Sequence, residues 1–236
     1  MAIKLSIFFL LFSQAFAQSE LEFIKKNYEY NIVIIENFFK SQGIELNLQE
    51  KDKTIDLTKL RSVRIPSVLA EVGNQTGVSL KDFKAQISSL EKKIFELFPR
   101  QGYYVGYCAF LTRSKLNLHF HDRKNTGGHI DESDPHIDSF KHTYWSYLIS
   151  TRINSEFAKL WFTARELKRM NSGLTDLSLN PINFMDMLNN LTGFKLSKMS
   201  IFMSYKLTAI IDQKFKNGEL FFHQNGEVLR TSLLLP

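Results

Sequence analysis

Apolar residues recur along most of the chain with the spacing of a helix. Between residues 21 and 42 they stand three and four positions apart, as one buried face of a helix requires. The same spacing returns over 137–148 and over 157–167, and the short break between these segments predicts a helical hairpin. Further helices are expected over residues 79–97, 103–118, 183–191 and 198–215.

The pattern changes near the C-terminal end of the chain. Residues 219–223 and 227–232 flank Asn225-Gly226, and an Asn-Gly pair between two short apolar segments indicates a β-hairpin. The expected fold class is therefore mainly α, a helical bundle with a small C-terminal β-hairpin. A polar, mixed stretch suggests the domain organisation: an N-terminal helix and polar linker over 18–78, then a helical domain over 79–236.

The first seventeen residues resemble a secretory leader. Lys4 precedes an apolar run over 5–12, and Ala15-Phe16-Ala17 is a small-x-small tripeptide of the kind that signal peptidase accepts. We expect a cleaved signal peptide over 1–17 and a secreted or periplasmic protein. The apolar run is shorter than the roughly 20 residues of a spanning helix, and no later segment is apolar enough, so no membrane span is expected in the mature chain.

Composition excludes several classes of protein. The chain of 236 residues is 44% hydrophobic and 23% charged, which is typical of a globular fold. Its one cysteine, Cys108, excludes an intramolecular disulfide and a Cys-rich zinc site, and its apolar neighbours favour a core residue over a nucleophile.

The charge of the chain indicates its partners only weakly. A formal net charge of +6 spread along the sequence favours an envelope polymer or lipid, and the lack of a basic stripe with aromatics argues against nucleic acid.

Candidate chemistry begins with the histidines. Five of them lie between residues 119 and 142 among several aspartates: His119, His121, His129, His136 and His142. Imidazole and carboxylate are zinc ligands, but no His-Glu-x-x-His is present, so a solvated loop and a metal site both remain open. His142 differs because Asp138 stands four residues before it on the same helix face. That carboxylate can orient the imidazole for a metal or a proton, although such a pair also serves purely structural roles.

Three further motifs follow in order. The helix Asp138-Ser139-Phe140-Lys141-His142-Thr143-Tyr144-Trp145 is followed by Ala164-Arg165-Glu166, by Met185-Asp186-x-x-Asn189-Asn190-x-x-Gly193 and by Gly218-Glu219-Leu220. This series resembles an uncharacterised bacterial domain family found in secreted, wall-associated and toxin-like proteins. Its motifs are Phe-Arg-His-Ala-Tyr-Trp, Ala-His-Glu and Met-Asp-x-x-Asn-Asn. The resemblance covers about the last hundred residues, with a weaker likeness back to the helix expected before Pro99.

The resemblance implies a shared polar site. His142, Glu166 and Asp186 match the family's polar motif residues and come from three predicted helices, which can converge inside a bundle. They would then hold a divalent metal ion with positions left for water. Alternatively, His142 would act as general base, with Asp138 orienting it and Glu166 as the acid. Either mechanism requires the three heads to meet within about 5 Å at an accessible cavity.

Two departures from the family favour a different interpretation. Arg165 replaces the family's histidine and Phe194 its arginine, and a guanidinium cannot ligate a metal. Arg165 pairing with Glu166 or Asp186 would make the cluster a buried structural network. Two functions therefore remain open: a metal-dependent or acid/base hydrolase acting on an envelope component, and a non-catalytic interaction or scaffold protein.

Overall fold

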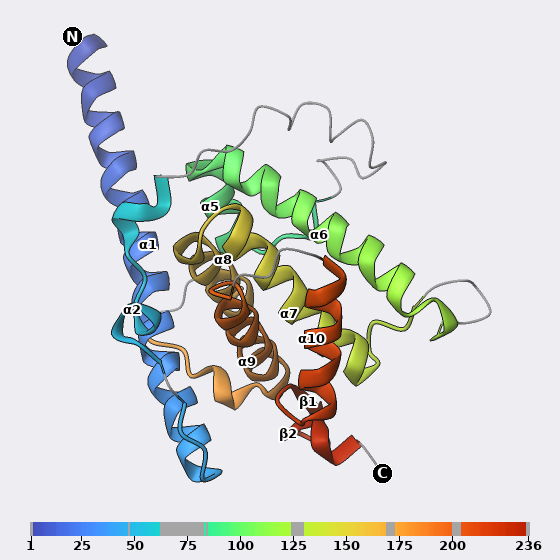
Figure 1. Cartoon of the computed structure of the whole chain (residues 1–236). Helices are drawn as coiled ribbons and strands as arrows, with labels where there is room; N and C mark the ends of the chain where they lie inside the picture. The colour runs from blue at the N-terminus through green and yellow to red at the C-terminus, as the bar shows by residue number, and fades with distance from the viewer. Residues whose placement is uncertain are drawn as a thin grey trace.

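The computed structural model describes residues 2–46, 48–61, 83, 85–123, 130–168, 173–199 and 204–234. It is mainly helical and ends in a two-stranded antiparallel hairpin, which confirms the expected fold class (Figure 1). The helices are α1 (Ala2–Ser41), α2 (Glu50–Lys53), α5 (Ser89–Leu97), α6 (Pro99–His119), α7 (Pro135–Arg152), α8 (Ser155–Leu167), α9 (Pro181–Leu196) and α10 (Ser204–Lys216). The strands are β1 (Phe221–Gln224) and β2 (Glu227–Arg230). Short 3-10 helices cover Leu57–Arg61, His121–Arg123, Leu177–Leu179 and Thr231–Leu234.

Prolines and polar caps set where the central helices begin. Pro99, Pro135 and Pro181 are the first residues of α6, α7 and α9, where the missing N–H would have no helical partner. Helix α6 thus begins at Pro99, four residues before the start expected from the apolar pattern. Asp134 and Asn180 accept hydrogen bonds from the first N–H groups of α7 and α9, which fixes the start of both.

The helix expected over residues 79–97 is interrupted at residues 87–88: residues 83, 85 and 86 are helical, and α5 begins at Ser89. Ser88 accepts a hydrogen bond from Glu91 N, and the Glu91 carboxylate accepts one from Ser88 N, which together form a capping box. Of the helix expected over residues 79–97, residues 79–82 and 84 lie outside the described part of the chain. The described helix therefore runs over Ser89–Leu97, with its start set by hydrogen bonding.

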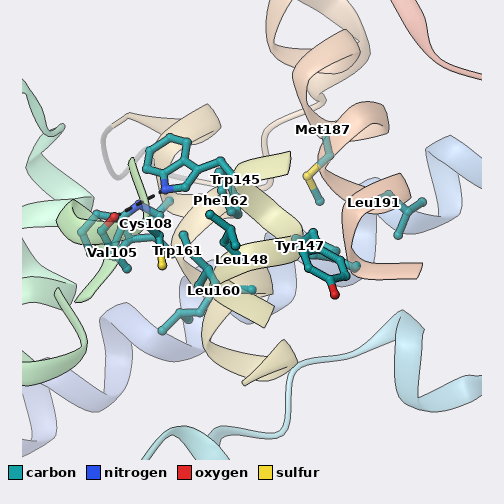
Figure 2. Packing of buried hydrophobic residues seen from close by; sticks show 14 of the residues in the cluster. Val105, Cys108, Trp145, Tyr147, Leu148, Leu160, Trp161, Phe162, Met187 and Leu191 are labelled. Atoms are coloured by element: carbon teal, nitrogen blue, oxygen red, sulfur yellow. Dashed lines mark hydrogen bonds between the residues drawn. The ribbon is translucent and has the colours of Figure 1, made fainter. Parts of the chain in front are cut away.

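The core lies around α7, which packs against α6, α8, α9 and α10. Figure 2 shows the buried side chains of this region, with the Trp145 indole donating from Nε1 to the Val105 carbonyl over 3.4 Å. The Phe162 ring meets Trp145 edge-on at 5.0 Å, and Cys108 is buried in the same region. Burial raises the pKa of the Cys108 thiol to about 12, which keeps it in the neutral form.

Helix α1 lies along one side of the bundle, and its N-terminal half extends beyond the other helices (Figure 1). Tyr28 and Ile32 are fully buried in the common core. Asn27 accepts a hydrogen bond from Thr175 N, and Asn31 contacts the same segment through both ends of its amide. The expected boundary between residues 78 and 79 falls outside the described residues. Within the described residues, no helix is long and apolar enough to cross a membrane.

The hairpin is held on α9 by one side chain. Asn225 and Gly226 both have positive φ angles, 52° and 83°, as a tight two-residue turn requires. Asn189 accepts a hydrogen bond from Phe221 N and donates one to Phe221 O, so its amide pairs with β1 as a strand would. The buried asparagine of the Asn189-Asn190 motif therefore connects the terminal hairpin to the bundle.

The closest contact between α7 and α9 occurs at Gly193. A Cβ built there would overlap Ser146 Oγ and the Thr143 carbonyl oxygen, and would lie 2.9 Å from Tyr147 N. Thr143 Oγ1 also donates a hydrogen bond to the Asn189 carbonyl across this interface. Only glycine allows the two backbones to approach this closely.

Replacing Gly193 by alanine tests this packing. In an open helix the change would stabilise the chain by up to about 1 kcal/mol, because alanine is the better helix former. Here we expect a loss of about 1–3 kcal/mol in unfolding free energy, because the methyl group forces α7 and α9 apart. Urea unfolding measures the change. The control is Gly173→Ala, where an added Cβ meets nothing within 4 Å; equal effects of the two substitutions would contradict the account.

Candidate functional site

The facing sides of α7 and α9 bring an imidazole and two carboxylates together. Asp138 and His142 lie one turn apart on α7, and Asp186 lies on α9 opposite them. His142 Nε2 is 3.1 Å from Asp186 Oδ1 and 3.7 Å from Asp138 Oδ1. One donor atom from each of the three residues lies within 4.8 Å of the others, a spacing that a single metal ion can bridge.

Asn190 completes the polar surface on α9. It lies four residues after Asp186, is fully buried, and interacts with the His142 ring so as to favour its protonated form, which raises its pKa. Neither Asn190 nor His142 Nδ1 is in a well-formed hydrogen bond, however. The motif Asp186-x-x-x-Asn190-x-x-Gly193 thus places its polar residues and its close-contact glycine on one helix face.

The environment keeps His142 neutral. Burial, together with the charges of Lys141 and Arg165, lowers the pKa of His142 to about 3, although the Asp138 charge opposes the shift. A neutral imidazole has one nitrogen lone pair available, which is the form that binds a metal. At neutral pH the ring is therefore available as a ligand, while its low basicity makes it a poor proton acceptor.

Glu166 and Asp186 interact as two buried acids. Burial raises the pKa of Glu166 well above its usual range, and the nearby Asp186 charge raises it further. Burial also raises the pKa of Asp186, to about 7, with the Asp138 charge acting in the same direction. Lys141, Arg165 and Lys168 oppose the shift at Asp186, but burial outweighs them. A carboxyl group that titrates near neutral pH is suited to transferring protons.

A cavity of about 580 Å³ opens beside these acids. Its wall includes Asp186 and Asn183 from α9, Glu166 from α8 and Glu91 from α5. Asn183 donates a hydrogen bond to the Glu166 carbonyl and so fixes α8 against α9 at this wall. The acid pair therefore faces a space large enough for part of a substrate.

Several buried polar atoms at this site have no hydrogen-bond partner among the described residues. They are His142 Nδ1, Glu166 Oε1, Asp186 Oδ1, Asn190 Nδ2 and Asn190 Oδ1. His142 Nε2 and Asp186 Oδ1 are close enough for a hydrogen bond but are not aligned for one. Native proteins rarely leave such groups unpaired, and an ion or ordered water commonly satisfies them.

The sequence-predicted residues divide between two positions. His142, Asp186 and Asp138 come together, and Asp138 thereby joins the group that can hold a metal. Glu166, which the motif resemblance placed among the ligands, is not in this group; it lies at the cavity wall beside Asp186, where the two charges interact. The structure thus separates a group of three possible ligands from a neighbouring acid.

Arg165 and Phe194, the two residues that differ from the motifs the sequence resembles, both have defined contacts in the structure. Arg165 forms no ion pair with Glu166 or Asp186. Its Nη1 lies 3.3 Å from Glu91 Oε1 on α5. Its guanidinium also lies over the Trp145 ring, 5.0 Å from the centroid. Phe194 is buried in the core against Phe162.

The other histidines do not join the site. His119 and His136 both direct Nε2 at the Asp212 carboxylate of α10, at 3.0 and 3.3 Å from Oδ1. This bridge connects α10 to α6 and α7. His121 is exposed and pairs with Asp122, while His129 lies outside the described residues.

Sequence reasoning missed both Asp212 and the Glu91–Arg165 pair. Asp212 lies 93 positions after His119, and Glu91 lies 74 positions before Arg165. A single sequence carries no periodic signal for contacts between helices so far apart. For Glu91, the one available signal was its spacing of three residues after Ser88, which indicates a cap rather than an ion pair.

Comparison of the chain with known protein families, curated proteins and solved structures finds no match. The resemblance drawn from the motifs stays a prediction.

The acid at position 186 makes stability depend on pH. Its pKa is about 7 in the folded chain and about 4 when unfolded, so between these values the folded state binds more protons and stability falls as pH rises. Asn at this position mimics the protonated acid. In zinc-free protein at pH 8 we expect Asp186→Asn to be more stable than wild type by on the order of 3 kcal/mol, with little difference below pH 4.

Urea unfolding of both proteins between pH 4 and pH 8 measures this difference. Asp122→Asn, at an exposed carboxylate, is the control and should track wild type throughout. A variant at position 186 that is less stable than wild type at pH 8 would show that the carboxylate is satisfied as an ion in the metal-free fold.

Proposed function

We propose that Asp138, His142 and Asp186 bind a divalent metal ion and that the chain is a metal-dependent hydrolase. The observation that carries the proposal is the convergence of the three donor groups within 4.8 Å, next to buried polar atoms without partners. One imidazole and two carboxylates suit zinc, which takes nitrogen and oxygen ligands and leaves a position for water in catalytic sites.

The misaligned contact between His142 and Asp186 supports a metal over a simple hydrogen bond. In a hydrogen bond the N–H points at the oxygen, whereas two ligands of one metal both point at a third position. The separation of 3.1 Å between His142 Nε2 and Asp186 Oδ1 matches the edge between two ligands that each lie about 2.0 Å from zinc.

The Lys141 ammonium group pairs with the Asp138 carboxylate and neutralises its charge. Its Nζ lies 2.5 Å from Asp138 Oδ1 and 3.6 Å from Glu132 Oε2. Because Glu132 is a second partner for Lys141, the ammonium group can move to that carboxylate when a metal takes its place at Asp138. The net charge of the ligand group is then balanced by the metal ion.

Glu166 supplies the proton chemistry in this mechanism. It lies at the cavity wall beside Asp186, and burial raises its pKa, which favours the protonated form. A metal ion held by Asp138, His142 and Asp186 would supply activation of the attacking water. Glu166 would donate its proton to the leaving group as the bond to that group breaks.

An envelope component is the substrate class that the chain's other features support. The leader-like residues 1–17 suggest export, and the net charge of +6 favours acidic polymers or lipids. The competing function is a non-catalytic scaffold, which the burial of His142 and Glu166, each less than a tenth exposed, favours. The unpartnered polar atoms and the adjacent cavity favour the hydrolase, because a structural network would be expected to satisfy its own members.

Metal binding is tested by titrating chelator-stripped protein with Zn²⁺ in a calorimeter. We expect one ion per chain, and weakening of roughly 100-fold or more for His142→Gln and Asp186→Asn, because each change removes a ligand. His121→Gln, at an exposed histidine, should bind like wild type. Binding of equal strength in all four proteins would place the ion elsewhere, and no binding to wild type would remove the metal from the proposal.

Hydrolysis is tested separately on isolated bacterial envelope fractions. Zinc-loaded wild-type protein should release soluble fragments detectable by mass spectrometry, and Glu166→Gln should release at least roughly 100-fold less while still binding Zn²⁺, because only the proton donor is lost. Release that is equal in the two proteins would exclude Glu166 as the acid. Release by neither protein would favour the scaffold.

A further inference from the structure

Arg165 lies between two cavities. It lines the cavity of about 580 Å³ that contains Asp186 and Glu166, and it also lines a smaller one of about 140 Å³ between α6 and α7. The smaller cavity has an aromatic side formed by Phe83, Phe110 and Trp145. A substrate that occupies the acid-lined cavity would therefore meet the guanidinium at its edge.

The guanidinium is held in a fixed orientation. Glu91 is 1% exposed and contacts Arg165 Nη1 through Oε1, while its other oxygen, Oε2, accepts the Ser88 N–H. The Trp145 ring covers one face of the guanidinium at 5.0 Å. Arginine has five N–H donors, and in Arg165 the Nη1 group donates to Glu91. No described residue accepts a hydrogen bond from its other N–H groups, which are nevertheless held in a fixed direction.

Two cations, Arg165 and Lys168, lie at the wall of the larger cavity beside its acids. Both act on Asp186 and oppose the upward shift of its pKa. Lys168 lines the larger cavity and has no ion-pair partner in the part of the chain that the structure describes. The Lys168 ammonium group and the free edge of the Arg165 guanidinium are therefore both placed to contact a negatively charged group.

We infer that Arg165, supported by Lys168, binds an oxyanion of the substrate, a phosphate or a carboxylate, in the cavity beside Asp186. Planar N–H pairs of arginine match both anions in a bidentate geometry. The Glu166 Oε1 atom is buried without a partner at the same wall, so a polar group of the ligand next to the oxyanion can form a hydrogen bond with it. The inference rests on the proposed function, because it names the substrate class of that site.

This arrangement also explains the departure at position 165. A guanidinium cannot serve as a metal ligand, but it can recognise the substrate next to one.

The test is anion binding by zinc-free protein, so that its outcome does not depend on the metal. Inorganic phosphate and acetate are titrated in turn while NMR follows the Arg165 Nε–Hε signal. We expect saturable binding in the millimolar range. Arg165→Lys, which keeps the charge but loses the planar donor pair, should bind roughly fivefold more weakly or worse. Stronger binding of phosphate indicates a phosphoryl substrate, and stronger binding of acetate a carboxylate substrate.

Removal of Arg165 alone would leave the buried Glu91 unpaired and destabilise the chain, so the decisive variant is Glu91→Gln/Arg165→Gln. It should lose anion binding, measured by ³¹P line broadening for phosphate, and keep Zn²⁺ binding. The matched control is Arg123→Gln, since Arg123 also pairs with a carboxylate, Asp134, and lies over an aromatic ring, Phe120, but does not line either cavity. Anion binding that survives in the double variant, or that is absent from wild type, overturns the inference. If the wild-type protein does not bind Zn²⁺, the proposed function is overturned instead.

Discussion

The contact between α7 and α9 at Gly193 is the constraint on which the site depends. Because no Cβ stands at this position, Ser146 and the Thr143 carbonyl of α7 reach the α9 backbone. One to two turns earlier on both helices, the same close approach places His142 against Asp186 and Asn190. Residue numbers rise together along these contacts, so α7 and α9 run parallel. Helix α8 connects back in the opposite direction and carries Glu166 to the end of the bundle where His142 and Asp186 lie.

The buried acids and the buried imidazole of the site lower the stability of the fold, and this indicates a functional role for them. Two acids are buried side by side with their pKa values raised, and an imidazole is buried with its pKa lowered to about 3. Replacing such groups by neutral residues is expected to stabilise the fold, and a site that opposes stability in this way is typical of binding and catalysis. By contrast, the buried Glu91 carboxylate is paired, with Arg165 at one oxygen and the Ser88 N–H at the other.

Local sequence patterns predicted much of the fold and only part of the site. Helical periodicity and the Asn225-Gly226 turn gave correct element types, because these signals act over a few residues. The spacing of Asp138 and His142 placed them on one face in the same way. Glu166 matched a motif, but whether it lies in the ligand group or beside it depends on how α8 packs, which spacing does not encode. Asp212 and Glu91 find their partners across the bundle, so nothing local pointed to them.

Locating a bound metal ion shows whether Asp138, His142 and Asp186 form the metal site. Crystals of the zinc-loaded chain, measured at wavelengths on either side of the zinc absorption edge, would locate the ion by its anomalous signal. We expect one anomalous peak, about 2.0 Å from His142 Nε2 and from one carboxylate oxygen each of Asp186 and Asp138. A peak between His119 and His136, or none at a saturating zinc concentration, would contradict it.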